Sequence, residues 1–185
     1  MKTALIVHGA YGNPQENWFL WLKEKLKDKY EVIVPKFPTP LNQTLEKWMV
    51  VYESYSEKIA NDSIFIGHSL GVAFLLRILE KQEITAAFFV AGVGGKVNNQ
   101  FWEGMRSFAE KKFDWEKIKR NCEEFHIYHS NDDPYIPLKH AELLAQHLST
   151  DLTFIKDAGH LNSDSGYTTF PKLLEDIKST AAKHL

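Results

Sequence analysis

The sequence lacks several features that would assign it to a specialised class of protein. It has one cysteine, Cys122, which excludes an intramolecular disulfide and a cysteine-rich metal site; we interpret it as a small buried hydrophobe. No apolar run approaches the length of a membrane span, and the N-terminal run at 4–7 is too short for a signal peptide. We therefore expect a cytoplasmic protein without a membrane partner.

The sequence also lacks an excess of positive or negative charge. The net charge is −2, which gives no reason to expect nucleic acid or an acidic membrane as a partner. The hydrophobic fraction of 44% and the charged fraction of 25% are typical of soluble globular proteins. A length of 185 residues, without an internal repeat, low-complexity tract or linker, predicts one domain spanning 1–185.

The stretch around Ser69 carries the main chemical signal. Gly67-His68-Ser69-Leu70-Gly71 fits the pattern G-x-S-x-G, in which a serine lies on a sharp turn between a strand and a helix. A serine hydroxyl is a weak nucleophile, and such a turn exposes it to a base and a substrate. Glycine is required where a side chain would collide with the neighbouring backbone. The apolar residues on both sides argue against a chance match.

Apolar runs and helical patterns alternate along the chain. Such alternation predicts a parallel sheet covered by helices on both faces, a three-layer α/β/α sandwich. Ligands bind such sheets at the carboxyl ends of the strands. The expected strands are 3–7, 31–34, 64–66, 86–91, 125–129 and 152–155. The first expected helix begins at Pro14, with Asn13 as its cap, and another begins after the cap residue Asp114. The other expected helices cover 41–59, 72–79, 99–111, 138–148 and 170–183.

Two strand ends after Ser69 supply the remaining members of a catalytic triad. A serine on such a strand-to-helix turn is called a nucleophile elbow. In hydrolases with this elbow the chain order is serine, then a carboxylate, then histidine. Asp132 and Asp133 follow one strand, and His160 follows the last strand. His160 would take the proton from Ser69, and a carboxylate would fix the imidazole tautomer. One of the two aspartates could instead only stabilise the turn by hydrogen bonds to its backbone. We favour Asp133 as the catalytic aspartate.

The second half of an oxyanion hole should come from the loop after the first strand. The backbone N–H groups of Ala10 and Leu70 are the candidates. His8 either holds this loop in place, which we favour, or contacts substrate. A zinc site of His8, His160 and an aspartate lacks ligand-like spacing, so we expect no metal and no cofactor. The other histidines are interpreted as structural or exposed: His68, His126, His129, His140, His147 and His184.

The segment 92–121 is the only connection long enough to cover the site, and it is too short for a large lid. Trp102 is its candidate substrate contact. The other aromatic and methionine side chains of the segment pack either on the sheet or against the pocket: Phe101, Met105, Phe108, Phe113 and Trp115. We expect a pocket that suits short acyl groups.

These residues resemble those of the α/β-hydrolase superfamily, and in particular the retinoblastoma-binding-protein-9/YdeN family of small serine hydrolases. The matching stretches span nearly the whole chain: His8-Gly9, residues 18–22, 67–71, 114–118 and 130–137, and Gly159-His160-Leu161-Asn162 with Ser165-Gly166. The resemblance implies a six-stranded parallel sheet with little or no lid. It also implies that Asp133, with Pro137 four residues later, is the catalytic aspartate. The L-x-C-x-E motif of one member of the family has no match at Cys122, so a retinoblastoma-protein partnership is not expected.

Two classes of function remain open. The first is a serine hydrolase that cleaves a small carboxylic ester, thioester or amide. The second is a non-catalytic protein-binding module that retains the fold, which would not need all three triad residues. Dinucleotide binding is less well supported, because the loop 9–14 lacks G-x-G-x-x-G. The sequence names neither the physiological substrate nor a protein partner.

Overall fold

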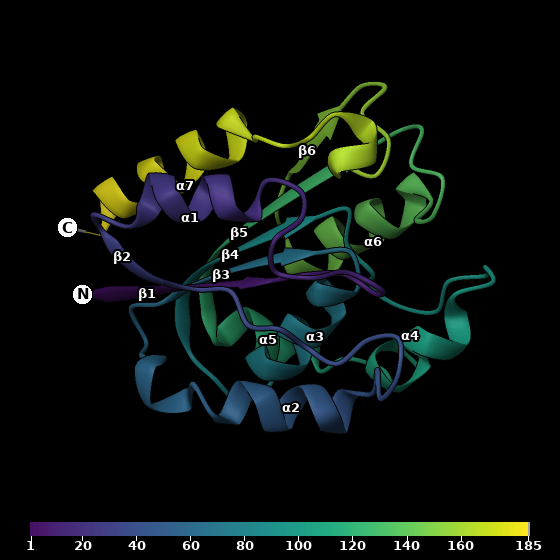
Figure 1. Cartoon of the computed structure of the whole chain (residues 1–185), viewed down its shortest axis with the longest axis horizontal. Coiled ribbons are helices and arrows are strands. Elements are labelled where there is room, and N and C mark those ends of the chain that lie inside the picture. Colours follow the sequence, from purple (N-terminus) through teal and green to yellow (C-terminus); the bar gives the residue numbers. More distant parts are fainter. Residues whose placement is uncertain (185) are drawn as a thin grey trace.

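A single parallel sheet forms the centre of the molecule (Figure 1). The computed structural model describes residues 1–184. The six strands of the sheet lie in the order β2-β1-β3-β4-β5-β6, as the sequence predicts a six-stranded parallel sheet. The strands are β1 (Lys2–Val7), β2 (Tyr30–Ile33), β3 (Ile64–His68), β4 (Ile84–Val90), β5 (Cys122–Ser130) and β6 (Leu152–Ile155).

The strand order places a topological switch point between β1 and β3. From β1 the chain moves outward to β2, and from β3 it moves outward in the opposite direction. Loops that leave the carboxyl ends of β1 and β3 therefore diverge, and the crevice between them is where open α/β sheets bind ligands. The loop that begins at His8 and the turn at Ser69 both start there.

Helices cover both faces of the sheet, which explains why its central strands β1, β3 and β4 are almost entirely buried and largely apolar. Along β1, Leu5 and Val7 belong to one hydrophobic cluster, whereas Ala4 and Ile6 belong to the other. This alternation follows from the period of two in a β-strand.

The helices complete the three predicted layers. Helices α1 and α7 contribute to the cluster on one face, and α2 to α6 contribute to the cluster on the other. Figure 1 shows α1 and α7 on one side of the sheet and α2, α3 and α5 on the opposite side. None of the helices within residues 1–184 is long and apolar enough to cross a membrane. The helices are α1 (Phe19–Leu26), α2 (Leu45–Glu53), α3 (Leu70–Leu79), α4 (Trp102–Ala109), α5 (Trp115–Arg120), α6 (Leu138–Leu148) and α7 (Pro171–Lys183).

Three helix starts differ from the prediction by three residues or more, and one of them is that of α4, which begins at Trp102 rather than at residue 99. Helix α1 does not begin at Pro14, because the Asn13 side chain forms a local turn by accepting from the N–H of Gln15 at 2.9 Å, and Asn17 adopts a positive φ of 53°. Helix α2 does not begin at residue 41. Thr44 caps it by accepting from the N–H of Lys47, and the helix ends at Glu53 rather than at residue 59.

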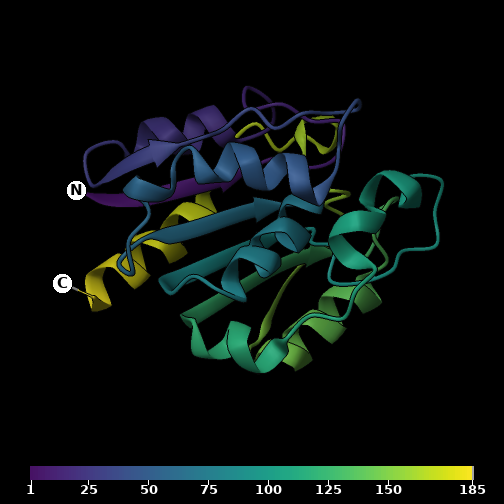
Figure 2. The ribbon, with the colours of Figure 1, turned by 90° about the horizontal axis from the view of Figure 1, so that it is seen from below.

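The connection between β4 and β5 contains two short helices, as expected for a hydrolase with little or no lid. It holds only α4, with 8 residues, and α5, with 6 residues. Asp114 caps α5 as predicted, by accepting from the N–H of Lys117. Figure 2 shows α4 beyond the carboxyl ends of the strands.

Candidate active site

Ser69 lies on a tight turn between β3 and α3. Its φ and ψ of 54° and −119° belong to a region that residues with side chains rarely adopt. Such strain persists where the surrounding structure imposes it. A Cβ added to Gly71 would lie 2.5 Å from the carbonyl oxygen of Val7 and 2.8 Å from that of His8. The elbow therefore requires glycine at position 71, because α3 starts in contact with the backbone that follows β1.

The loop after β1 packs directly against the serine. A Cβ added to Gly9 would lie 2.9 Å from Ser69 Cβ and 3.4 Å from Ser69 Oγ. Ala10 lines the same cavity as Ser69. Leu70 is the first residue of α3, so its N–H has no acceptor within the helix. The loop and the helix start thus flank the serine on two sides.

His8 holds this loop in place. Its ring is fully buried, its Nδ1–H donates to the carbonyl of Gly9 at 2.8 Å, and its Nε2 accepts from the N–H of Phe37 at 3.1 Å. Burial lowers the pKa of His8, although the bond to Gly9 opposes the shift. A neutral ring with both nitrogens engaged matches the structural role that the sequence favours over substrate contact.

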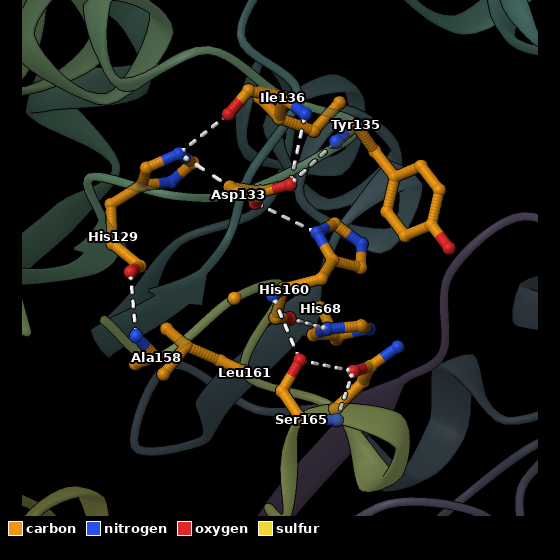
Figure 3. A network of polar contacts seen from close by, with 12 residues as sticks. His68, His129, Asp133, Tyr135, Ile136, Ala158, His160, Leu161 and Ser165 are labelled. Atoms are coloured by element: carbon orange, nitrogen blue, oxygen red, sulfur yellow. Dashed lines mark hydrogen bonds and ion pairs between the residues drawn. The ribbon is translucent and has the colours of Figure 1, made fainter. Parts of the chain in front are cut away.

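Asp133 and His160 form a hydrogen-bonded pair (Figure 3). Nδ1 of His160 lies 2.8 Å from Oδ2 of Asp133. The other carboxylate oxygen accepts from the N–H groups of Tyr135 at 2.8 Å and Ile136 at 3.0 Å. Burial alone would raise the pKa of Asp133, but the hydrogen bond and charge of His160 and the two N–H donors outweigh it and lower that pKa. Asp133 is therefore an oriented, ionised acceptor for His160.

Two further histidines surround this pair. His129 Nε2 donates to the carbonyl of Ile136 at 2.8 Å and lies 3.7 Å from Asp133 Oδ2. His68 Nε2 donates to the carbonyl of His160 at 2.9 Å. Burial, with a smaller contribution from His160, lowers the pKa of His68 to about 3. Burial also lowers the pKa of His129. In both rings Nε2 is engaged by a backbone carbonyl, which orients the ring beside the Asp133–His160 pair.

Ser69 and His160 border one cavity of about 420 Å³. Within residues 1–184, no hydrogen bond joins the Ser69 hydroxyl to the His160 ring. Catalytic hydrogen bonds often tighten only when substrate is bound. The strained serine, the backbone N–H groups beside it and the oriented imidazole together provide the components for nucleophilic acyl transfer.

Comparison with known proteins assigns the chain to a family. A protein-family model described as Serine hydrolase matches residues 4–179. The chain belongs to this family. It is 26% identical to YdeN of Bacillus subtilis (strain 168), over 98% of this chain and 97% of YdeN. It is also 26% identical to serine hydrolase RBBP9 of Rattus norvegicus, over 95% of this chain and 94% of RBBP9.

Solved structures give the same relationship. The crystal structure of the ydeN gene product from B. subtilis superposes with a TM-score of 0.90, covering 98% of this chain and all of that one. Est1E from Butyrivibrio proteoclasticus superposes with a TM-score of 0.71 at 16% identity, covering 98% of this chain and 88% of Est1E. The similarity to Est1E shows a shared fold and nothing more. The predicted resemblance to the α/β-hydrolases and to the YdeN/RBBP9 group is therefore confirmed.

The cavity of this serine hydrolase is lined by both apolar and acidic side chains. Phe101, Met105 and Tyr135 are among its lining residues. Glu16 and Asp164 also line it, and no lysine or arginine is among its lining residues within residues 1–184. Burial raises the pKa of Glu16, the Asn13 backbone opposes this shift, and the Asp164 charge adds to it. The cavity is consequently unfavourable for an additional negative charge.

One predicted contact lies elsewhere. Trp102 does not line the cavity around Ser69; it borders a separate hollow with Lys96 and Arg106. The neighbouring Phe101 and, one helical turn later, Met105 line the cavity instead. Both residues belong to the segment 92–121, which the sequence places near the site. The sequence does not indicate which side of α4 faces the cavity. Within residues 1–184, no cluster of three or more His, Cys, Asp or Glu side chains is arranged to hold a metal ion.

Proposed function

We propose that this protein hydrolyses small carboxylic esters, thioesters or amides through an acyl-enzyme on Ser69. The observation that carries the proposal is the 2.8 Å contact between His160 Nδ1 and the buried Asp133 carboxylate, at the rim of the cavity that also holds the strained Ser69. This contact leaves Nε2 of His160 as the free basic nitrogen, as general base catalysis requires.

Each residue has a defined part in the two half-reactions. In the first, Ser69 Oγ attacks the substrate carbonyl carbon while its proton passes to His160 Nε2. The developing oxyanion is held by the N–H groups of Leu70 and Ala10. The tetrahedral intermediate then collapses, the bond to the leaving group breaks, and His160 gives the leaving group its proton. Asp133 stabilises the imidazolium that exists between these transfers.

The second half-reaction repeats these steps with water. His160 removes a proton from the water as it attacks the acyl carbon, and it returns that proton to Ser69 Oγ when the ester bond to the enzyme breaks. The products are a carboxylic acid and the free enzyme. No metal or cofactor is needed to balance either half-reaction.

The cavity favours short acyl groups. A volume of about 420 Å³ bounded by Phe101 and Met105 accommodates small substrates, and α4 and α5 add only a short wall. We expect kcat/KM for p-nitrophenyl esters to peak between acetate and butyrate and to fall for longer chains. An optimum at long acyl chains would contradict the proposed pocket, and an absence of turnover across ester, thioester and amide panels would favour a non-catalytic binding module.

A further inference from the structure

Two loops carry the acid and the base of the proposed triad, and side chains join them. Residues 130–132 precede Asp133, and residues 157–159 precede His160. The backbone N–H groups of Asp157, Ala158 and Gly159 all donate to side chains of residues 130–132. We name the side chains of Ser130, Asn131 and Asp132 the loop clamp.

The clamp consists of hydrogen bonds within residues 130–132 and from these residues to residues 157–159. The N–H of Gly159 donates to Asp132 Oδ1 at 2.8 Å, and the N–H of Ala158 donates to Ser130 Oγ at 2.9 Å. Ser130 Oγ in turn donates to Asp132 Oδ1. The N–H of Asp157 donates to Asn131 Oδ1 at 2.9 Å, and Asn131 Nδ2 donates back to Asp157 Oδ1 at 3.1 Å.

The segment that carries His160 needs such external support. Asp157, Gly159 and Leu161 have φ values of 51°, 53° and 52°, so alternate residues lie in the left-handed region. A chain of this kind forms no helix or strand of its own, and residues with side chains are unfavourable there. The position of the His160 backbone is therefore set by its contacts.

Asp132 makes the contact nearest to the base, because Gly159 is the residue directly before His160. A Cβ added to Gly159 would lie 2.3 Å from Ser165 Oγ, and the same hydroxyl accepts from the His160 N–H at 3.2 Å. Asp132 thus binds the N–H of Gly159 and Ser165 binds the N–H of His160, while Asp133 holds the His160 ring.

We infer that Asp132 is a positioning residue for His160: one aspartate of the pair holds the ring of the base, and its neighbour holds the backbone that carries it. This role rests on the proposed function, because positioning matters only if His160 is the base. A displacement of a reacting group by about 1 Å costs on the order of 100-fold in rate. Loss of the clamp should lower kcat and leave substrate binding in the cavity unchanged.

The test compares Asp132→Ala with Asp132→Asn and with Asp151→Ala. The asparagine retains one oxygen that can accept from Gly159, and Asp151 is an exposed residue before β6 whose replacement changes the net charge equally. We expect Asp132→Ala to lower kcat for p-nitrophenyl acetate by about 10- to 100-fold with KM within about twofold. Asp132→Asn should restore most of the loss, and Asp151→Ala should match the wild type.

A second readout does not depend on turnover. The His160 Nδ1–H that bonds to Asp133 should give a downfield proton resonance, and the Gly159 amide should be protected from hydrogen exchange. Asp132→Ala should weaken the resonance and speed Gly159 exchange at least about tenfold. If Asp132→Ala does not fold, Ser130→Ala, which removes the link to Ala158, takes its place.

The outcomes separate the two proposals. A kcat for Asp132→Ala equal to that of Asp151→Ala, or a loss of kcat with the His160 resonance and Gly159 exchange unchanged, would overturn the positioning role. Full activity in Ser69→Ala would overturn the proposed function instead. In that case the resonance and the exchange rate still decide whether Asp132 holds the His160 segment.

Discussion

Acidification should destabilise this protein through His68, the residue before the nucleophile. The His68 ring is buried, and its Nε2–H donates to the carbonyl of His160 at 2.9 Å. Its Nδ1 has no hydrogen-bond partner within residues 1–184. A proton on Nδ1 would therefore create an unpaired buried charge beside His160. Burial accordingly lowers the pKa of His68 from 6.5 to about 3.

The size of the effect follows from proton linkage. Between the folded pKa of about 3 and the unfolded value of 6.5, the unfolded chain binds a proton at His68 and the folded chain does not. Stability from this site is therefore complete above the unfolded pKa and is lost as the pH falls toward the folded pKa. A shift of this size lowers the free energy of unfolding by about 2 kcal/mol between pH 7 and pH 5.

His68→Gln isolates this contribution. Glutamine retains an N–H donor for the His160 carbonyl and does not titrate. Burial also lowers the pKa of His8 and His129, so the wild type includes their contributions as well. Only the difference between wild type and variant in the pH dependence of the free energy of unfolding reports on position 68. His147→Gln, at an exposed position on α6, controls for the loss of a histidine.

The assay is urea unfolding of the three proteins at pH 7, 6 and 5. We expect the wild type and His147→Gln to lose about 2 kcal/mol more than His68→Gln over this range, whatever the variant's stability at pH 7. Equal losses in wild type and His68→Gln would refute the reasoning and show that the buried ring accepts a proton without cost.

Three further results are expected. Asp133→Asn should lower kcat about 10⁴-fold, because the amide favours the wrong tautomer of the catalytic histidine, while Asp132→Asn should cost far less; the reverse ranking in ester hydrolysis would contradict the assignment. Gly9→Ala should lower kcat by roughly 10- to 100-fold, because its Cβ would lie 2.9 Å from that of the nucleophilic serine, whereas Gly95→Ala, with no atom within 4 Å of the new methyl group, should match the wild type. Glu16→Gln should improve kcat/KM for a succinyl ester relative to a butyryl ester, since it removes a negative charge from the cavity wall; an unchanged ratio would exclude that charge as a selectivity factor.

The sequence predicts the sheet and the elbow because their signals are local. Apolar runs identify the buried strands, and the glycines beside Ser69 mark a turn that only a close approach of backbones explains. The start of α1 was not predictable in this way. Asn13 and Pro14 are suitable for a helix start and for a turn, and the positive φ of Asn17 decides between them. That conformation is accompanied by a tertiary contact, in which the N–H of Ser163 donates to Asn17 Oδ1 at 2.9 Å.

The remaining features of the site depend on contacts that are distant in sequence. Phe101 lines the cavity and Trp102 does not, although the two are adjacent and chemically alike. Only the packing of α4 on the molecule distinguishes them. The loop clamp requires β5 and β6 to pair with Ser130 opposite Ile155, and strand register between separate segments is not encoded in either segment alone.

The most direct test of the proposed mechanism is the covalent modification of Ser69. The purified protein is treated with a fluorophosphonate probe and its intact mass is measured, with Ser69→Ala treated in parallel. We expect the wild type to gain the mass of one phosphonyl group, mapped to the peptide that contains Ser69, and we expect no gain in the variant. Labelling that persists in Ser69→Ala, or a wild type that remains unmodified while folded, would contradict the assignment of Ser69 as an activated nucleophile.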